Sequence, residues 1–136
     1  MESLAFSFLL EPGKTEEWRA WIREIVGPRR SEYEAFSRKV GLKTQRAYLQ
    51  HTPQGDQAII YIEGNDLQRT FRELQMSQDL FAVVLRQRMQ DLFGVDLTQT
   101  DPGALSQYIF GGPSAQEDEA MHQAWEGMER LGMISP

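Results

Sequence analysis

The chain has 136 residues, of which 40% are hydrophobic and 25% charged, and this composition is typical of one folded domain with a tail. Fourteen basic residues against twenty acidic ones give a net charge of −6, which argues against nucleic-acid binding, because that function needs clustered cations. The absence of cysteine excludes disulfides, thiolate nucleophiles and cysteine metal sites.

The hydropathy pattern indicates whether the chain is expected to enter a membrane or to be exported. No run approaches 18 apolar residues, so no transmembrane helix is expected. Met1–Ser3 is acidic and polar rather than basic, and no apolar run follows it, so no signal peptide is expected. We therefore expect a cytoplasmic protein with no membrane partner.

The first predicted element is a strand over residues 3–10, in which large apolar side chains alternate with mostly small ones. The large side chains are Leu4, Phe6, Phe8 and Leu10. The pair Pro12-Gly13 ends this strand, and residues 14–26 follow as a predicted helix. The apolar stripe of this helix has the spacing i, i+3, i+4 and i+7 and consists of Trp18, Trp21, Ile22 and Ile25.

A break at Gly27-Pro28 divides the first helical stretch, because proline disrupts a helix interior. Ser31 and Glu34 then have the spacing of a capping box, which predicts a second helix over about residues 31–40. Gly41 ends it. The connection between the first two strands is thus predicted as two helices rather than one.

Residues 42–51 and 57–64 alternate as two further strands, and the turn signal Gly55-Asp56 between them predicts a hairpin. Two more helices are predicted after the hairpin. The first covers about residues 66–75 and the second, with Ser77 as its cap, about residues 77–93.

The last strand has two candidate positions. Residues 105–110 are preferred, and Val95–Leu97 is the competitor. Gly111–Pro113 is a break, and a second capping box at Ser114–Glu117 predicts a tail helix up to about Leu131.

The predicted order β-α-β-β-α-β is the split-βαβ, ferredoxin-like plan. We predict an α+β domain with a four-stranded antiparallel sheet over residues 1–112, followed by a C-terminal helical extension over residues 113–136. A sheet with helices on one face leaves its other face open, and a second copy would cover it, so a homodimer is predicted. The plan alone fixes no function.

The segment Phe8–Lys14, followed by Glu17-Trp18, resembles the start of dimeric α/β-barrel proteins, and most closely an uncharacterised bacterial family among them. The resemblance covers residues 3–110. It implies helices on one face of a four-stranded sheet, and two such sheets packed face to face. Members of the superfamily include cofactor-independent quinol monooxygenases, haem-degrading enzymes and isomerases, but no diagnostic motif of these enzymes occurs here.

The two histidines of the chain are candidate chemical groups. His51, at a strand-to-turn junction near Asp56, could be a general base or a haem or metal ligand, and the alternative is an exposed loop histidine. His122 on the tail helix is interpreted as a surface residue. No histidine pattern with the spacing of a metal site occurs, so neither a metal nor another cofactor is expected.

Four side chains are predicted to share the sheet face that turns away from the helices: Arg46, Tyr48, Tyr61 and Glu63. They could form a pocket wall for an anionic or aromatic ligand, with arginine pairing a carboxylate. The alternative is cross-strand pairing and dimer contact. Trp21, with Trp18, could line a ligand cavity, although aromatic residues at helical spacing are typical of a core.

The tail helix carries an apolar stripe of Met121, Trp125 and Met128. It could dock on its own domain, on the second subunit or on a foreign partner, and docking within the dimer is expected.

Two functions remain open at this point. The first is a homodimeric ligand-binding or regulatory domain. The alternative is a cofactor-independent monooxygenase or isomerase acting on a small aromatic or polyketide-like substrate. A cavity of about 300 Å³ or more lined by the candidate residues would favour the enzyme.

Overall fold

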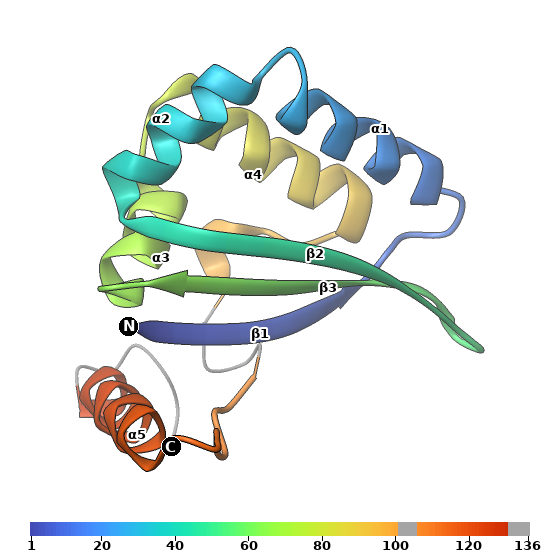
Figure 1. The fold of residues 1–136 in the computed structure, drawn as a ribbon. Helices are drawn as coiled ribbons and strands as arrows, with labels where there is room; N and C mark the ends of the chain where they lie inside the picture. Colours follow the sequence, from blue (N-terminus) through green and yellow to red (C-terminus); the bar gives the residue numbers. More distant parts are fainter. Residues whose placement is uncertain (101–105, 131–136) are drawn as a thin grey trace.

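The computed structural model describes residues 1–100 and 106–130 and has an α+β architecture (Figure 1). Its sheet consists of β1 (Glu2–Leu9), β2 (Leu42–Thr52) and β3 (Gly55–Gly64). The helices that precede residue 100 are α1 (Thr15–Val26), α2 (Arg30–Val40), α3 (Leu67–Met76), α4 (Leu80–Phe93) and the short 3-10 helix η1 (Leu97–Gln99). The last described helix is α5 (Ala115–Arg130).

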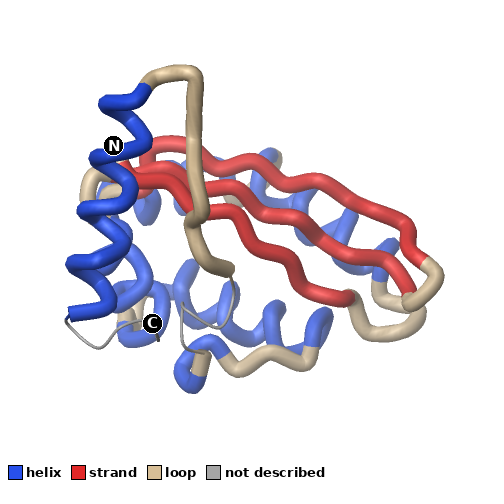
Figure 2. The backbone as a smooth tube through the Cα atoms, turned by 90° about the horizontal axis from the view of Figure 1, so that it is seen from below, coloured by secondary structure: helices blue, strands red, loops and turns tan. Residues whose placement is uncertain are grey.

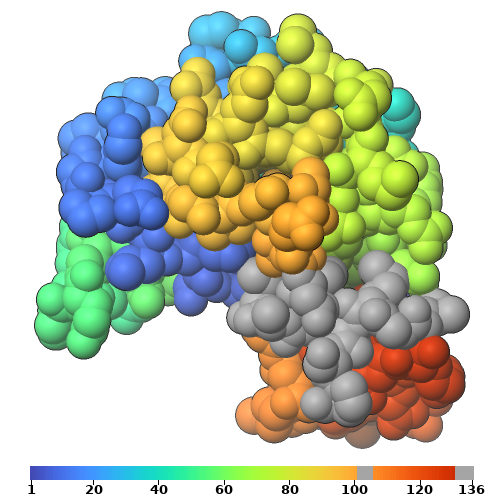
Figure 3. All heavy atoms as spheres, turned by 180° about the vertical axis from the view of Figure 1, so that it is seen from behind, coloured from blue at the N-terminus to red at the C-terminus, as the bar shows by residue number. Residues whose placement is uncertain are grey.

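The central strand of the sheet is β3, which pairs antiparallel with β1 on one side and with β2 on the other. From Thr44 to Thr52 the pairing of β2 with β3 runs without a shift, so successive residues alternate between the two faces of the sheet. Helices α1, α2 and α4 pack over one face (Figure 1). From behind, α4 lies between α1 and α3 (Figure 3).

The core is formed by two apolar clusters. The larger one joins the helix-facing side of the sheet to α1, α2 and α4, and its largest buried members are Trp18, Trp21, Phe36, Phe81 and Phe93. The smaller one joins β1 and β3 to α3 and α5 and contains Leu4, Ile62, Leu67, Phe71, Trp125 and Met128. The sheet alternation and the helical stripes predicted from the sequence therefore meet in the core as expected.

Local sequence signals fix several helix ends. Gly41 has φ +79°, a left-handed conformation that glycine adopts without strain, and it ends α2 as predicted. The Asp66 carboxylate accepts the Arg69 N–H at 3.1 Å and caps α3. Ser114 Oγ accepts the Glu117 N–H at 3.3 Å, so the predicted cap of the tail helix is confirmed.

Two predicted caps are wrong. Helix α2 begins at Arg30, so Ser31 lies inside its first turn and does not cap it. Helix α4 begins at Leu80, because Ser77 is extended and its hydroxyl accepts the Asp79 N–H instead. In both places the capping motif is present in the sequence, but the neighbouring chain starts the helix elsewhere.

The predicted fourth strand is not observed in the described part of the chain. Residues 106–110 of the preferred candidate have no strand pairing, while Leu105 lies outside the described residues. The competitor Val95–Leu97 leads into η1 instead. The physical reason is that the segment before α5 is bound to α5, since the Asp118 carboxylate accepts bonds from the Tyr108 hydroxyl and from the Gly111 N–H.

Helix α5 lies beside the N-terminal end of β1 (Figures 1 and 2). Its apolar stripe is buried against its own chain, which is the first of the three predicted alternatives. The Ser3 N–H at this edge donates to Met121 Sδ at 3.1 Å. Of the helices in the described ranges, none is long and apolar enough to cross a bilayer.

Candidate functional site

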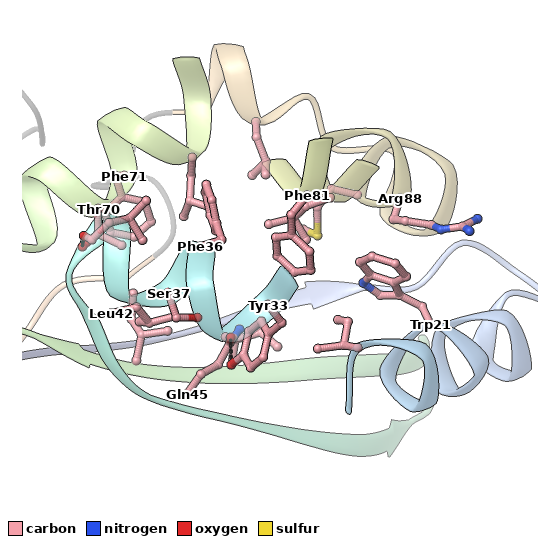
Figure 4. Close-up of a pocket in the computed structure, with 18 of the residues that line it drawn as sticks. Trp21, Tyr33, Phe36, Ser37, Leu42, Gln45, Thr70, Phe71, Phe81 and Arg88 are labelled. Atoms are coloured by element: carbon pink, nitrogen blue, oxygen red, sulfur yellow. Dashed lines mark hydrogen bonds between the residues drawn. The ribbon is translucent and has the colours of Figure 1, made fainter. Parts of the chain in front are cut away.

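A pocket of about 140 Å³ lies between the sheet and the helices (Figure 4). Trp21 of α1, Phe36 of α2 and Phe81 of α4 form much of its aromatic wall. The floor comes from the helix-facing side of the sheet, including Ile60 and Gln45. The pocket is thus continuous with the larger core cluster, and α3 also lines it through Thr70 and Phe71.

Phe81 is the centre of the aromatic wall. Its ring centroid lies 6.2 Å from that of Trp21, 5.7 Å from that of Tyr33 and 5.5 Å from that of Phe36. Offset and tilted pairs at these distances are favourable beyond their apolar burial. The wall therefore joins α1, α2 and α4 through one residue.

Polar atoms are few in this pocket. The half-buried Tyr33 hydroxyl donates to Gln45 Oε1 at 2.8 Å, and burial raises the pKa of Tyr33. The buried atoms Ser37 Oγ and Arg88 Nε make no well-formed hydrogen bond with the described residues, and both residues line the pocket. An unpaired buried donor or acceptor costs about 1–3 kcal/mol, so these two atoms are an unfavourable feature of the pocket wall.

Arg88 is the cation of this pocket. Its guanidinium carbon lies 5.3 Å from the centroid of the Trp21 ring, a cation–π geometry. Among the described residues no carboxylate lies within 4.0 Å of it. Arg86, two residues earlier, behaves differently, since it donates to the carbonyl oxygens of Leu74 and Ser77 and closes the α3–α4 connection.

Of the residues predicted as a site, Trp21 lines the pocket. The predicted site residues of the sheet lie on the face turned away from the helices, as the alternation predicts, and they are Arg46, Tyr48, Tyr61 and Glu63. Arg46 and Tyr61 are opposite each other in the register, and the guanidinium lies 5.7 Å from the tyrosine ring centroid. The structure therefore does not bring these four residues together with Trp21.

His51 lies apart from both groups, near the tip of the β2–β3 hairpin. Its side chain is 72% exposed, and the alternation places it on the face opposite to Arg46. His51 Nδ1 is 2.6 Å from Asp56 Oδ1, and Asp56 Oδ2 accepts the Thr15 hydroxyl at 2.7 Å. The bond from His51 and, next, the bond from Thr15 lower the pKa of Asp56.

Sequence reasoning missed Arg88, Ser37, Tyr33 and Gln45 as pocket residues. One signal for Arg88 is present in the sequence, because it lies on the apolar stripe of α4, seven residues after Phe81 and four before Leu92. A cation at such a position needs a partner.

Within residues 1–100 and 106–130, no group of three or more His, Asp or Glu side chains is placed to hold a metal ion. Comparison of the chain with family models, with curated proteins and with solved structures gives no match.

Proposed function

We propose that this protein is a small-molecule-binding domain whose ligand occupies the pocket between the sheet and the helices. The observation that carries the proposal is an apolar space of about 140 Å³ that is walled by aromatic side chains and has Arg88 as its one charged residue among the described lining residues. An apolar cavity of about 150 Å³ in another protein binds benzene, so this volume suits one six-membered ring.

The working unit that we propose is a homodimer in the cytoplasm with a ferredoxin-like arrangement, akin to the dimeric α/β-barrel proteins. The strand order β1-β3-β2 supports this arrangement, since these strands are adjacent in the same order in a ferredoxin-like sheet. The open sheet face supports the dimer, because Leu9 and Tyr48 are 45% and 54% exposed there. The cysteine-free sequence is compatible with the cytoplasm.

The pocket favours binding over the alternative of a monooxygenase or isomerase. Neither a histidine nor a carboxylate is among the described residues that line it. The pKa of Tyr33 is raised, which makes that phenol a poorer acid for proton transfer at neutral pH. The volume is below the 300 Å³ expected for the enzyme, and a polyketide-like substrate of several rings exceeds it.

The proposal is tested by filling the pocket. Toluene and benzoate are titrated into the protein, and amide shifts are followed by NMR for residues that line the pocket. In Leu85→Trp, a larger ring enters the pocket, so binding of either probe weakens by about tenfold or more. Leu80→Trp makes the same change on the same helix at a position that is 65% exposed, and binding is retained.

Two results would contradict the proposal. One is that neither probe shifts pocket signals up to its solubility limit. The other is that Leu85→Trp, shown to be folded by circular dichroism, binds both probes as the unchanged protein does.

A further inference from the structure

On the basis of the proposed function, we infer that the ligand is a single-ring aromatic carboxylate and that Arg88 binds its carboxylate group. The inference depends on three features of the pocket: its size, its charge and the position of the arginine.

The size limits the ligand to one ring with a short substituent. The space of about 140 Å³ lies among aromatic side chains of α1, α2 and α4, and Phe81 contacts three of them. A planar ring fits such surroundings because aromatic rings pack favourably against each other in offset or tilted geometry.

The charge favours an anion. Arg88 is the only lysine, arginine or histidine among the described lining residues, and no aspartate or glutamate lines the pocket with it. The chain as a whole is acidic, with a net charge of −6. Arg88 is partly buried, and the hydration that it loses without a carboxylate partner would be offset by an anionic ligand group.

The position of Arg88 suits a ligand that sits inside the pocket with its charged group at one end. The side chain extends past the indole of Trp21 at one end of the pocket (Figure 4). Stacking on an aromatic ring uses the face of the guanidinium, whereas its N–H donors point along the edge. The buried Nε has no described partner. A carboxylate accepts two parallel N–H bonds from such an edge, while a neutral amide cannot match both.

The experiment compares two probes of nearly equal shape, benzoate and benzamide, by isothermal titration calorimetry at pH 7. We expect benzoate to bind at least tenfold more tightly than benzamide. Arg88→Gln weakens benzoate by about tenfold to hundredfold and changes benzamide by less than about threefold. Arg88→Lys keeps the charge but loses the parallel N–H donors of the guanidinium. It should bind benzoate more tightly than Arg88→Gln and less tightly than the unchanged protein.

Arg23→Gln is the matched control, because it makes the same change at an exposed position of α1, and it leaves both affinities unchanged. Thermal unfolding shows whether each variant is folded. If benzoate and benzamide bind equally, or if Arg88→Gln keeps the preference for benzoate, the inference is overturned while the binding function stands. If neither probe nor toluene binds, both proposals fail.

Discussion

Asp56 accepts hydrogen bonds from two segments that are far apart in the sequence. His51 reaches it from across the hairpin turn at 2.6 Å, and Thr15 reaches it from the first residue of α1 at 2.7 Å. The Leu10 N–H also donates to the Asp56 backbone carbonyl at 2.8 Å. This residue therefore attaches the tip of the hairpin to the start of α1. The histidine predicted as a catalytic candidate has a structural partner here, and a role in chemistry stays a prediction.

The lowered pKa of Asp56 predicts a pH dependence of stability. Because the folded protein favours the ionised carboxylate, the stabilisation is complete above the unfolded value of 3.8 and is lost as the pH falls through the lower folded pKa. Asp56→Asn should therefore be less stable than the unchanged protein at pH 6, and the difference should shrink below pH 3.8. Urea unfolding at a series of pH values measures it.

The control for this prediction is Asp91→Asn, at an exposed position of α4 for which the described residues provide no ion pair within 4.0 Å. Its stability difference should not follow the same curve. If the difference in free energy of unfolding between Asp56→Asn and the unchanged protein stays constant from pH 6 to pH 2.5, stability does not depend on ionisation of Asp56.

At the scale of elements, α5 is held by a few large side chains. Trp125 is 5% exposed and packs with Met128 against Leu4 and Ile62 of the sheet. Asp118 binds the segment before the helix, and burial and then this bond raise the pKa of Tyr108 to about 12. The tail helix is therefore packed as part of the smaller core cluster.

Trp125→Ala should destabilise the protein by about 3–5 kcal/mol, since it removes a large buried side chain and leaves a cavity. Urea unfolding followed by far-UV circular dichroism measures this loss. Gln123→Ala, on the exposed side of the same helix, should change the free energy of unfolding by less than about 0.5 kcal/mol. A loss below about 1 kcal/mol for Trp125→Ala would mean that α5 does not pack on β1 and β3 in solution.

The elements that could be predicted from sequence are those with a long periodic pattern. The alternation of Leu4, Phe6 and Phe8 identifies β1, and the 3.6-residue stripe of Trp18 and Trp21 identifies α1. The segment at 105–110 has strand-forming residues, but pairing depends on a neighbouring edge that local propensity cannot report. Its attachment to Asp118, eight residues beyond it, is a tertiary contact.

The pocket residues, too, divide into one that a periodic pattern predicts and others that only the packing brings together. Trp21 could be predicted as an inward-facing residue because it belongs to an apolar stripe. Arg88, Ser37 and Gln45 come from three different elements, and only the packing of α4, α2 and β2 brings them around one space. Charged and polar residues on a helix are usually solvated, so their sequence positions alone do not indicate a site.

At the scale of the whole molecule, the face of the sheet that no helix covers is the surface that a second copy would cover in the proposed dimer. The register places Arg46 opposite Tyr61 and Tyr48 opposite Ile59 on this face. Two such faces related by a two-fold axis would bury the same patch on both subunits, and sheets pack in this way about 10 Å apart. The arrangement would cover apolar rings and still leave the pocket on the opposite side of each sheet accessible to its ligand.

The dimer proposal predicts that sedimentation equilibrium gives twice the mass of the chain at micromolar concentrations. Tyr48→Asp places a charge on the open face opposite Ile59, where a partner would have to desolvate it, so this variant should sediment as a monomer. Leu80→Asp makes a similar change at a residue that is 65% exposed on α4, away from the sheet, and should remain a dimer. A monomer at all concentrations would contradict the dimer proposal, and a dimer that survives Tyr48→Asp but dissociates in Leu80→Asp would place the interface on the helices.

Benzoate binding measured on the monomeric variant then separates dimerisation from ligand binding. Because the pocket is formed by residues of one chain, the monomer should bind benzoate with unchanged affinity.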